Sequence, residues 1–231
     1  MKYFIQRLIR LFNKGYNKIS LDSREYMFYE MILYKKMLKK KYNISFGDYL
    51  EFGVYKGDGT VAFVKALKKF KNEFKNTELF LFDSFTGLPE KVSFKDDLDI
   101  WHKGLFDVGG KEKFKAIIKK KGLPLEKIKI IDGFFNESLK SLNLDLKPGI
   151  INIDCDYYSS AKTVLNFLND KMVAGTLIYF DDLNSFFNNP NKGVLSAILE
   201  FNKNNTNVGL AECPFFSSKY NNRIYWVWKN D

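Results

Sequence analysis

The chain has few cysteines and no long apolar run. Its 231 residues include two cysteines, Cys155 and Cys213, which are too few for a disulfide framework and suit a reduced cytoplasm. No run of eighteen apolar residues occurs, so we expect no transmembrane helix. The first residues lack an uninterrupted apolar core and a small-residue cleavage site, so we expect no signal peptide. A chain of this length is most simply one folded domain, and the cysteines place it in the cytoplasm.

Arginine is also scarce, although the formal net charge is +10. Most of the excess charge is lysine in short helical runs at 35–41, 65–75 and 111–121. Solvated helix faces opposite apolar stripes explain such runs. No RNA-binding motif occurs, so we predict no nucleic-acid partner. Positive charge at the rim of a cleft would also suit an anionic substrate.

The two common nucleotide-binding fingerprints are missing from the glycine-bearing turn at residues 49–60. Three residues separate Gly53 from Gly57, which excludes the dinucleotide spacing, and no Gly-Lys-Ser/Thr follows, which excludes a phosphate loop. The glycines still let the backbone approach a ligand, and the free amides of the next helix would face that ligand. Glu51, just before the turn, suits a ligand with a cationic or hydroxyl-rich part.

What the sequence does contain is acids placed directly after apolar strands. Two such strands, expected at 149–154 and 175–181, each end in a pair of acids: Asp154, Asp156, Asp181 and Asp182. The carboxyl ends of neighbouring parallel strands meet at one edge of a sheet, so four carboxylates would share one cleft. Their repulsion raises their pKa values unless a cation lies among them, and a divalent cation with oxygen ligands is the simplest solution.

The simpler interpretation is that each Asp caps a helix or starts a turn. Two doublets about 25 residues apart on similar strands favour a site instead. A metal-dependent phosphoryl-transfer enzyme or hydrolase would use the same acids but leave the glycine turn without a role. A non-enzymatic binding protein would need only the turn.

Two further strands also end in an acid. Asp83 and Ser84 follow the second strand, where an acid commonly holds ribose hydroxyls. Asp132 and Gly133 follow the third strand and lead into two aromatics, 134 and 135. These aromatics either lie beside an adenine ring or belong to the core, which is the commoner place for phenylalanine.

In this order, the segments at 51–57, 83–89, 154–160 and 181–182 resemble the macrocin O-methyltransferase family, the sugar-modifying methyltransferases of macrolide and aminocoumarin biosynthesis. The similarity spans roughly residues 45–228. It implies a class I S-adenosylmethionine-dependent O-methyltransferase that uses a divalent metal, usually Mg²⁺, and acts on a sugar hydroxyl.

The resemblance also implies roles for individual residues. The cofactor-binding positions are Glu51, Gly53, Tyr55, Gly57, Thr60, Asp83, Ser84, Asp132 and Gly133. The metal ligands are Asp154, Asp181 and Asp182, and Asp156 matches the acid that removes the hydroxyl proton. His102 is a second catalytic candidate, because some relatives have a histidine in the variable segment that becomes a lid.

The chemistry of the reaction agrees with these roles. A metal chelated by two adjacent hydroxyls lowers the hydroxyl pKa and fixes the acceptor, and Asp156 takes the proton as the bond forms. Catechol-type methyltransferases use a lysine near the first metal acid, whereas here no lysine follows Asp154 until Lys162. This favours a sugar acceptor over a catechol-like one. We expect a nucleotide-activated sugar, or a glycoconjugate of a surface polysaccharide or secondary metabolite.

The layout predicts an α/β, Rossmann-like class I methyltransferase fold: a mostly parallel seven-stranded sheet with an antiparallel strand near the edge and helices on both faces. Strands are expected at 48–54, 78–83, 127–132, 149–154, 175–181, 207–213 and 222–229. Helices are expected at 3–14, 22–41, 58–71, 110–121, 160–170 and 191–204.

We divide the chain into an N-terminal helical extension, 1–44, and a methyltransferase domain, 45–231, with a lid segment at about 86–109. The basic amphipathic helix at 3–14 docks on the domain or on a second subunit of a homo-oligomer, or lies on a membrane surface. Residues 91–108 should be poorly ordered without ligand and close over it, with Trp101 or His102 reaching the acceptor.

Overall fold

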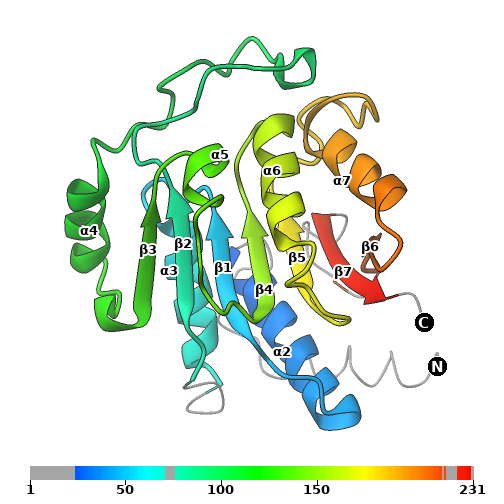
Figure 1. Ribbon diagram of the computed structural model, residues 1–231. Coiled ribbons are helices and arrows are strands. Elements are labelled where there is room, and N and C mark those ends of the chain that lie inside the picture. The colour runs from blue at the N-terminus through cyan, green and yellow to red at the C-terminus, as the bar shows by residue number, and fades with distance from the viewer. Residues whose placement is uncertain (1–23, 71–75, 215, 217–222, 230–231) are drawn as a thin grey trace.

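The computed structural model describes residues 24–70, 76–214, 216 and 223–229. Its seven-stranded sheet has the order β3-β2-β1-β4-β5-β7-β6. The strands are β1 (Asp48–Phe52), β2 (Leu79–Asp83), β3 (Ile128–Asp132), β4 (Pro148–Ile153), β5 (Leu177–Phe180), β6 (Val208–Glu212) and β7 (Ile224–Lys229). Strands β1 to β5 pair in parallel, and β7 is antiparallel to both β5 and β6 (Figure 1). The predicted fold class, including the antiparallel strand next to the edge, is confirmed.

Helices cover both faces of this sheet. They are α2 (Arg24–Tyr42), α3 (Asp58–Lys68), α4 (Lys111–Lys120), α5 (Phe135–Ser138), α6 (Tyr158–Leu168) and α7 (Gly193–Asn204), with short 3₁₀ turns η1 (Phe94–Asp96) and η2 (Leu125–Lys127). The sequence did not predict α5, because a single turn is too short to show a helical period.

Alternation along the buried strands separates the core into two layers. Tyr49 and Leu81 pack with α2, α3 and α4 on one face, and Leu50 and Phe82 pack with α6 and α7 on the other. Figure 1 shows α5, α6 and α7 in front of the sheet and α3 behind it. Residues i and i+2 of a strand share a face, so these short apolar runs bury both faces of the sheet at once.

Helix α2 belongs to the domain core. Met27, Phe28 and Met31 are fully buried in the same cluster as the strands. The Phe28 ring meets Tyr49 and Phe63 edge-on, with centroids 5.7 Å and 5.6 Å apart. The second half of the predicted N-terminal extension is therefore packed on the α/β domain predicted at 45–231. The helix predicted at 3–14, with its docking or membrane contact, lies outside the described residues.

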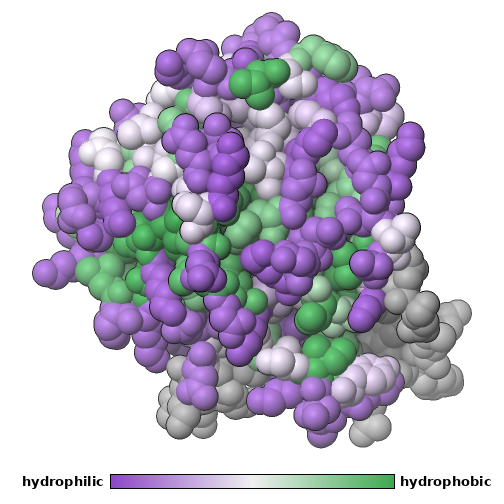
Figure 2. Space-filling model, in the orientation of Figure 1, coloured by the Kyte–Doolittle hydropathy of each residue, from purple (hydrophilic) through white to green (hydrophobic). Residues whose placement is uncertain are grey.

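No helix in the described part of the chain combines the length and apolarity needed to cross a membrane. Cys155 and Cys213 are both buried and free of a disulfide. Hydrophilic side chains cover most of the face in Figure 2, as expected if the lysine runs are solvated helix faces.

The lid segment runs above the carboxyl ends of the strands, at the top of Figure 1. Its two arms pair with each other: Leu88 N donates to Leu105 O at 2.8 Å, and Gly104 N donates to Leu88 O at 2.9 Å. Trp101 is buried against Tyr157 and forms one small apolar cluster with it. The aromatic side chain that sequence periodicity left unassigned thus has a packing role in the lid segment.

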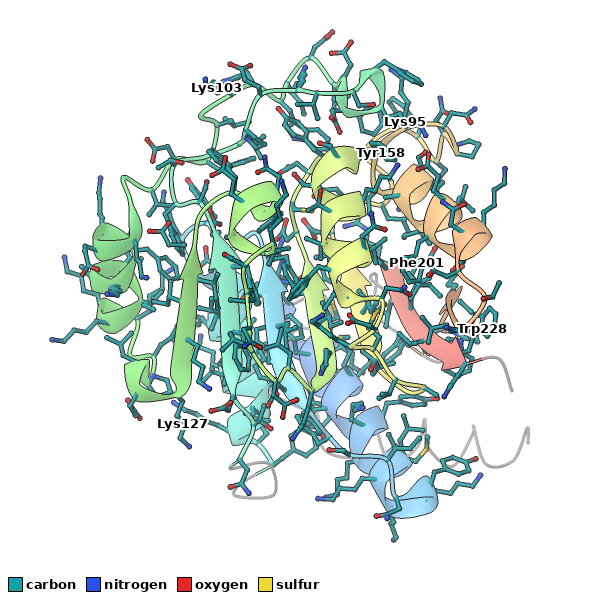
Figure 3. The ribbon with its side chains drawn as sticks, viewed as in Figure 1. Lys95, Lys103, Lys127, Tyr158, Phe201 and Trp228 are labelled. Atoms are coloured by element: carbon teal, nitrogen blue, oxygen red, sulfur yellow. The ribbon has the colours of Figure 1, made fainter. Side chains whose placement is uncertain are left out.

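The middle of the lid segment is fastened to α6 and α7. Lys95 Nζ pairs with the Glu200 carboxylate and lies 4.5 Å from the centre of the Tyr158 ring. Figure 3 labels Lys95 and Tyr158 near each other. The buried Asp96 carboxylate accepts a hydrogen bond of 2.8 Å from Ser159 N in the first turn of α6. If residues 91–108 are poorly ordered without ligand, as predicted, these contacts must break in the absence of ligand.

Candidate active site

A cavity of about 770 Å³ opens at the carboxyl edge of the parallel strands, where α/β folds collect their functional groups. The glycine turn and all four strand-end acids of β4 and β5 line it together. The predicted site residues in its wall are Glu51, Gly53, Tyr55, Asp83, Ser84, Gly133, Asp154, Asp156, Asp181 and Asp182. Four others are not in the wall: Gly57, Thr60, Asp132 and His102.

Gly53 is required by the protein backbone itself. Its φ is +83°, and a Cβ there would overlap the carbonyl oxygen of Asp154. The sequence predicted a glycine that makes room for a ligand, whereas the nearest obstacle is the neighbouring strand end. Gly57 begins α3 with a φ of +78° and faces Ile118 of α4. The turn is thus held in shape from two sides.

Asp83 builds the same turn. One of its oxygens accepts hydrogen bonds from Val54 N at 2.6 Å and Tyr55 N at 2.9 Å, and the other accepts from Phe85 N at 2.7 Å. Both carboxylate oxygens therefore fix the backbone of the two loops. The first oxygen, Oδ2, thus accepts two hydrogen bonds, whereas Oδ1 accepts one and keeps a second lone pair for a further donor.

Glu51 is fully buried behind the turn. Its carboxylate accepts hydrogen bonds from the hydroxyls of Tyr49 and Thr60 and from the Asn152 amide. Burial raises the pKa of Glu51 to about 7, although these donors act to lower it. Thr60, which does not line the cavity, therefore positions the Glu51 carboxylate that does. The sequence analysis missed Tyr49 and Asn152, and the available signal for Asn152 was a lone amide in an apolar strand.

The carboxylates of Asp154, Asp181 and Asp182, here called the carboxylate trio, lie close enough to share one cation. One oxygen from each lies within 4.8 Å of the others. Ligand oxygens on opposite sides of a bound Mg²⁺ or Ca²⁺ are about 4 to 5 Å apart, so spacing and donor type both fit a hard divalent cation. Burial and then the charge of Asp181 raise the pKa of Asp154 well above its usual range and that of Asp182 to about 6.

Arg24 of α2 also reaches the carboxylate trio. Its Nη1 lies 3.1 Å from Asp154 Oδ2 and its Nη2 lies 3.1 Å from Asp181 Oδ2. Burial alone would lower the pKa of Arg24, but the charges of Asp154 and Asp181 more than reverse this and raise it. The sequence gave no sign of this contact, because the helix start and the strand ends are far apart along the chain.

Asp156 faces the carboxylate trio from the turn between β4 and α6. Its φ of +60° lies in the left-handed region, and its backbone N donates to Asp182 Oδ2 at 3.1 Å. Such a strained residue persists only where its surroundings hold it, which is common at functional sites. Burial, and then repulsion from Asp182 and Asp181, raises the pKa of Asp156 to about 8. A carboxylate with a raised pKa is a stronger base once it is ionised.

The structure does not bring His102 or Asp132 into the cavity. His102 is exposed on the lid segment, where its Nδ1 lies 3.1 Å from Lys103 O, and Asp132 is exposed at the end of β3. Spacing alone could not give the path of the lid segment, so we leave His102 out of the site. Phe134 and Phe135 do line the cavity, beside Gly133.

The family model of macrocin-O-methyltransferase (TylF) matches residues 36–208, well over half of the chain. The chain belongs to this family. It is therefore an O-methyltransferase, and S-adenosylmethionine is its methyl donor. The predicted resemblance is confirmed, and the hydrolase and non-enzymatic alternatives are removed.

Solved structures share the fold. The O-methyltransferase NovP is 18% identical with a TM-score of 0.61, and 87% of this chain aligns with 79% of that one. CalS11, a calicheamicin methyltransferase, is 19% identical with a TM-score of 0.62 over 99% of this chain and 91% of the other. An O-methyltransferase from Bacillus cereus in complex with SAH is 12% identical with a TM-score of 0.52, covering 99% and 90%. No curated protein matches the chain in sequence.

The charges around the cavity suit the methyl donor, whose sulfonium is positive. Acids line the cavity on every side: Glu51, Asp58, Asp83, Glu90, Asp154, Asp156, Asp181 and Asp182. Among the described residues, its only basic side chains are Arg24 and Lys56. The lysine-rich exterior does not extend into the cavity, so the described part of the site is built for cations.

Proposed function

We propose that this methyltransferase transfers the methyl group of S-adenosylmethionine to a sugar hydroxyl and that a divalent cation, held by the carboxylate trio, is required. One observation carries the proposal: the carboxylate trio and the base candidate Asp156 share a single cavity with the glycine turn. Methyl donor, acceptor and cation would therefore meet in one place.

The turn at 53–57 and the residues around it would bind the donor. Asp83 fixes the backbone of this turn, and Glu51 sets its buried support. Ser84, Gly133 and the aromatics at 134–135 continue the wall and offer a place for the nucleoside. Asp132 stays in the proposal only through its position next to Gly133.

The opposite wall would bind the acceptor. A divalent cation, when bound, lowers the pKa of a coordinated hydroxyl. Asp154, Asp181 and Asp182 would hold that cation, and Asp156 would accept the hydroxyl proton on its carboxylate. The hydroxyl oxygen bonds to the methyl carbon while the carbon–sulfur bond breaks, and the sulfur leaves as neutral S-adenosylhomocysteine. The apolar cluster that Trp101 of the lid segment forms with Tyr157 would help to keep water from this wall.

A sugar acceptor is favoured over a catechol-like one by the lack of a lysine base. Lys162 is engaged elsewhere, with its Nζ 3.0 Å from Tyr158 Oη and 3.1 Å from Glu200 Oε2. CalS11, in its apo structure with a TM-score of 0.52, is described as a TDP-rhamnose 3'-O-methyltransferase. We propose an acceptor sugar with adjacent hydroxyls, carried on a nucleotide or on a glycoconjugate of a polysaccharide or secondary metabolite.

Because acids dominate the cavity wall, the sugar itself would enter the cavity and any diphosphate would stay at its mouth. We place the enzyme in the cytoplasm, where methyl donor and nucleotide sugars are made.

A direct screen tests the proposal. The enzyme is incubated with S-adenosylmethionine, Mg²⁺ and a panel of nucleotide sugars and simple glycosides, and products are read by mass spectrometry as a gain of one methylene. Matched panels contain sugars with adjacent hydroxyls and analogues in which one hydroxyl of the pair is removed. We expect methylation of the intact diols alone. Methylation of isolated hydroxyls at the same rate would contradict the chelated-diol mechanism.

A further inference from the structure

The carboxylate trio already holds one cation that belongs to the chain. The guanidinium of Arg24 bridges two of its members, with Nη1 and Nη2 each 3.1 Å from an oxygen of Asp154 and of Asp181. Asp182 is bound differently: it accepts hydrogen bonds from Asp156 N at 3.1 Å and from the Ser185 hydroxyl at 3.4 Å. Arg24 therefore neutralises only the part of the trio that faces α2.

The guanidinium and a divalent cation compete for the same carboxylates. A cation ligated by all three members of the trio would bind Asp154 and Asp181, the two carboxylates that now accept N–H donors from Arg24. The two positive groups would also stand within a few ångströms of each other in a partly buried site, where repulsion is only weakly screened. Both cannot bind these oxygens at full strength.

Arg24 has room to move away without disturbing its helix. Its side chain is 33% exposed and lies in the wall of the cavity. The first turns of α2 are held by other residues, since Tyr26, Met27 and Phe28 are buried in the core. The second nearby arginine, Arg223, lies 3.7 Å from Asp181, farther than Arg24, and its charge also acts to lower the pKa of Asp182.

We propose that Arg24 is an exchangeable counter-ion of the carboxylate trio: it pairs with Asp154 and Asp181 when no metal is bound, and a divalent cation must displace it to bind. This inference rests on the proposed function, because it takes the trio as the metal site. Arg24 thereby sets the metal affinity, holding the acids in place without metal and weakening the binding of metal when it arrives.

Isothermal titration of Mn²⁺ into the full chain, without cofactor or acceptor, tests the exchange. Arg24→Gln removes the competing charge and should bind Mn²⁺ at least about tenfold more tightly than the wild type, a change of about 1.4 kcal/mol. Lys69→Gln is the matched control. Lys69, at the end of α3, pairs at 3.2 Å with Glu25, which follows Arg24 in α2, and its loss removes equal charge without touching the trio. The control should change Mn²⁺ affinity by less than twofold.

Arg24→Lys is a second test, in case Arg24→Gln does not fold without metal. Lysine keeps the charge but cannot place two N–H donors on two carboxylates, so its Mn²⁺ affinity should lie between those of the wild type and Arg24→Gln. Thermal unfolding gives a second readout: without metal Arg24→Gln should melt below the wild type, and saturating Mn²⁺ should close or reverse that difference.

The outcomes separate the two proposals. Equal or weaker Mn²⁺ binding by both Arg24 variants, with the wild type binding normally, would overturn the exchange and leave the metal site standing. Absence of Mn²⁺ binding in all of the proteins would overturn the metal site and the exchange with it. Mn²⁺ binding by Arg24→Gln but not by the wild type would support the exchange and show that Arg24 outcompetes Mn²⁺ in the wild type.

Discussion

The two walls of the cavity differ in how their acidic side chains are stabilised. On the wall of β1 and β2, here called the cofactor half (Glu51, Gly53, Tyr55, Asp83 and Ser84), each buried acid has its own donors from the chain. Asp83 accepts three backbone N–H groups, and Glu51 accepts two hydroxyls and an amide. On the wall of β4 and β5, the acceptor half (Asp154, Asp156, Asp181 and Asp182), acids face one another. Burial, and then the charges of neighbouring acids, raises the pKa of Asp154, Asp156 and Asp182.

This difference shows which part of the site the fold completes. The cofactor half is finished by hydrogen bonds within the chain, so it should bind its ligand without help. The acceptor half has an excess of negative charge that a cation must balance. Arg24 balances part of it, and a divalent cation would balance more.

The largest expected effect separates the halves by turnover. Asp182→Ala removes one member of the carboxylate trio, so methyl transfer should fall by about 10³-fold, since even residues behind a metal ligand are worth 10- to 100-fold. Affinity for S-adenosylhomocysteine should stay within about twofold, because none of the donors to Glu51 or Asp83 is touched. Titration calorimetry and a turnover assay measure the two quantities. If the folded Asp182→Ala variant lost cofactor affinity as strongly as turnover, the proposed separation between the cofactor half and the acceptor half would be wrong.

The next effect concerns Gly53, where the halves meet. Gly53→Ala should destabilise the fold by about 3 kcal/mol, because it combines a left-handed φ with overlap on the Asp154 carbonyl. Gly104→Ala is the control, since its φ is +79° and nothing lies within 4 Å of the added Cβ. Denaturant unfolding should show a cost of only about 1 kcal/mol for the control. Equal costs would mean that φ alone, and not the contact between the two halves, explains Gly53.

A pH effect of roughly 2 to 3 kcal/mol should come from Glu51. Its pKa rises from 4.5 in the unfolded chain to about 7 in the fold, so the folded protein binds more protons between these values. Stability should therefore fall as pH rises from about 4.5 to 7. Glu51→Gln keeps the shape and removes this titration, so unfolding of the two proteins across this range isolates the slope. Identical slopes would show that Glu51 does not titrate in this window.

The smallest effect, about 1 kcal/mol, concerns the lid segment. Lys95→Met breaks the pair with Glu200, so amides at 91–108 should exchange faster with solvent, and cofactor plus acceptor should restore part of the protection. Lys103→Met, which breaks the solvent-exposed pair with Glu90, is the control on the same segment and should leave exchange unchanged. Equal rates in all three proteins would show that the Lys95 anchor does not hold the lid segment.

The sequence predicted the sheet and most of the site because both depend on short-range patterns. Apolar runs marked the strands, and an acid at the end of such a run marks the carboxyl edge of a parallel sheet. This pattern alone was enough to predict the positions of four acids, Asp154, Asp156, Asp181 and Asp182. Their grouping in one cavity followed once β4 and β5 were neighbours.

Contacts that depend on tertiary packing could not be predicted. Arg24 meets Asp181 across 157 positions of the chain, and no local pattern sets that distance. The path of the lid segment depends on contacts of Lys95 with α7 and of Asp96 with α6. Spacing along the sequence could not show that this path leaves His102 outside the cavity. Gly53 was predicted as a glycine that lets the backbone approach a ligand, and the structure adds a constraint that the sequence did not show, the Asp154 carbonyl.

The division between the two halves is tested most directly by removing metal from the whole reaction. The wild-type enzyme is treated with chelator and then titrated with Mg²⁺, while S-adenosylhomocysteine affinity and methyl transfer to an accepted sugar are measured in the same samples. We predict cofactor affinity that stays within about twofold throughout, and methyl transfer that is lost in chelator and restored by Mg²⁺. Methyl transfer that continues undiminished in chelator, or cofactor affinity that falls together with it, would contradict the account.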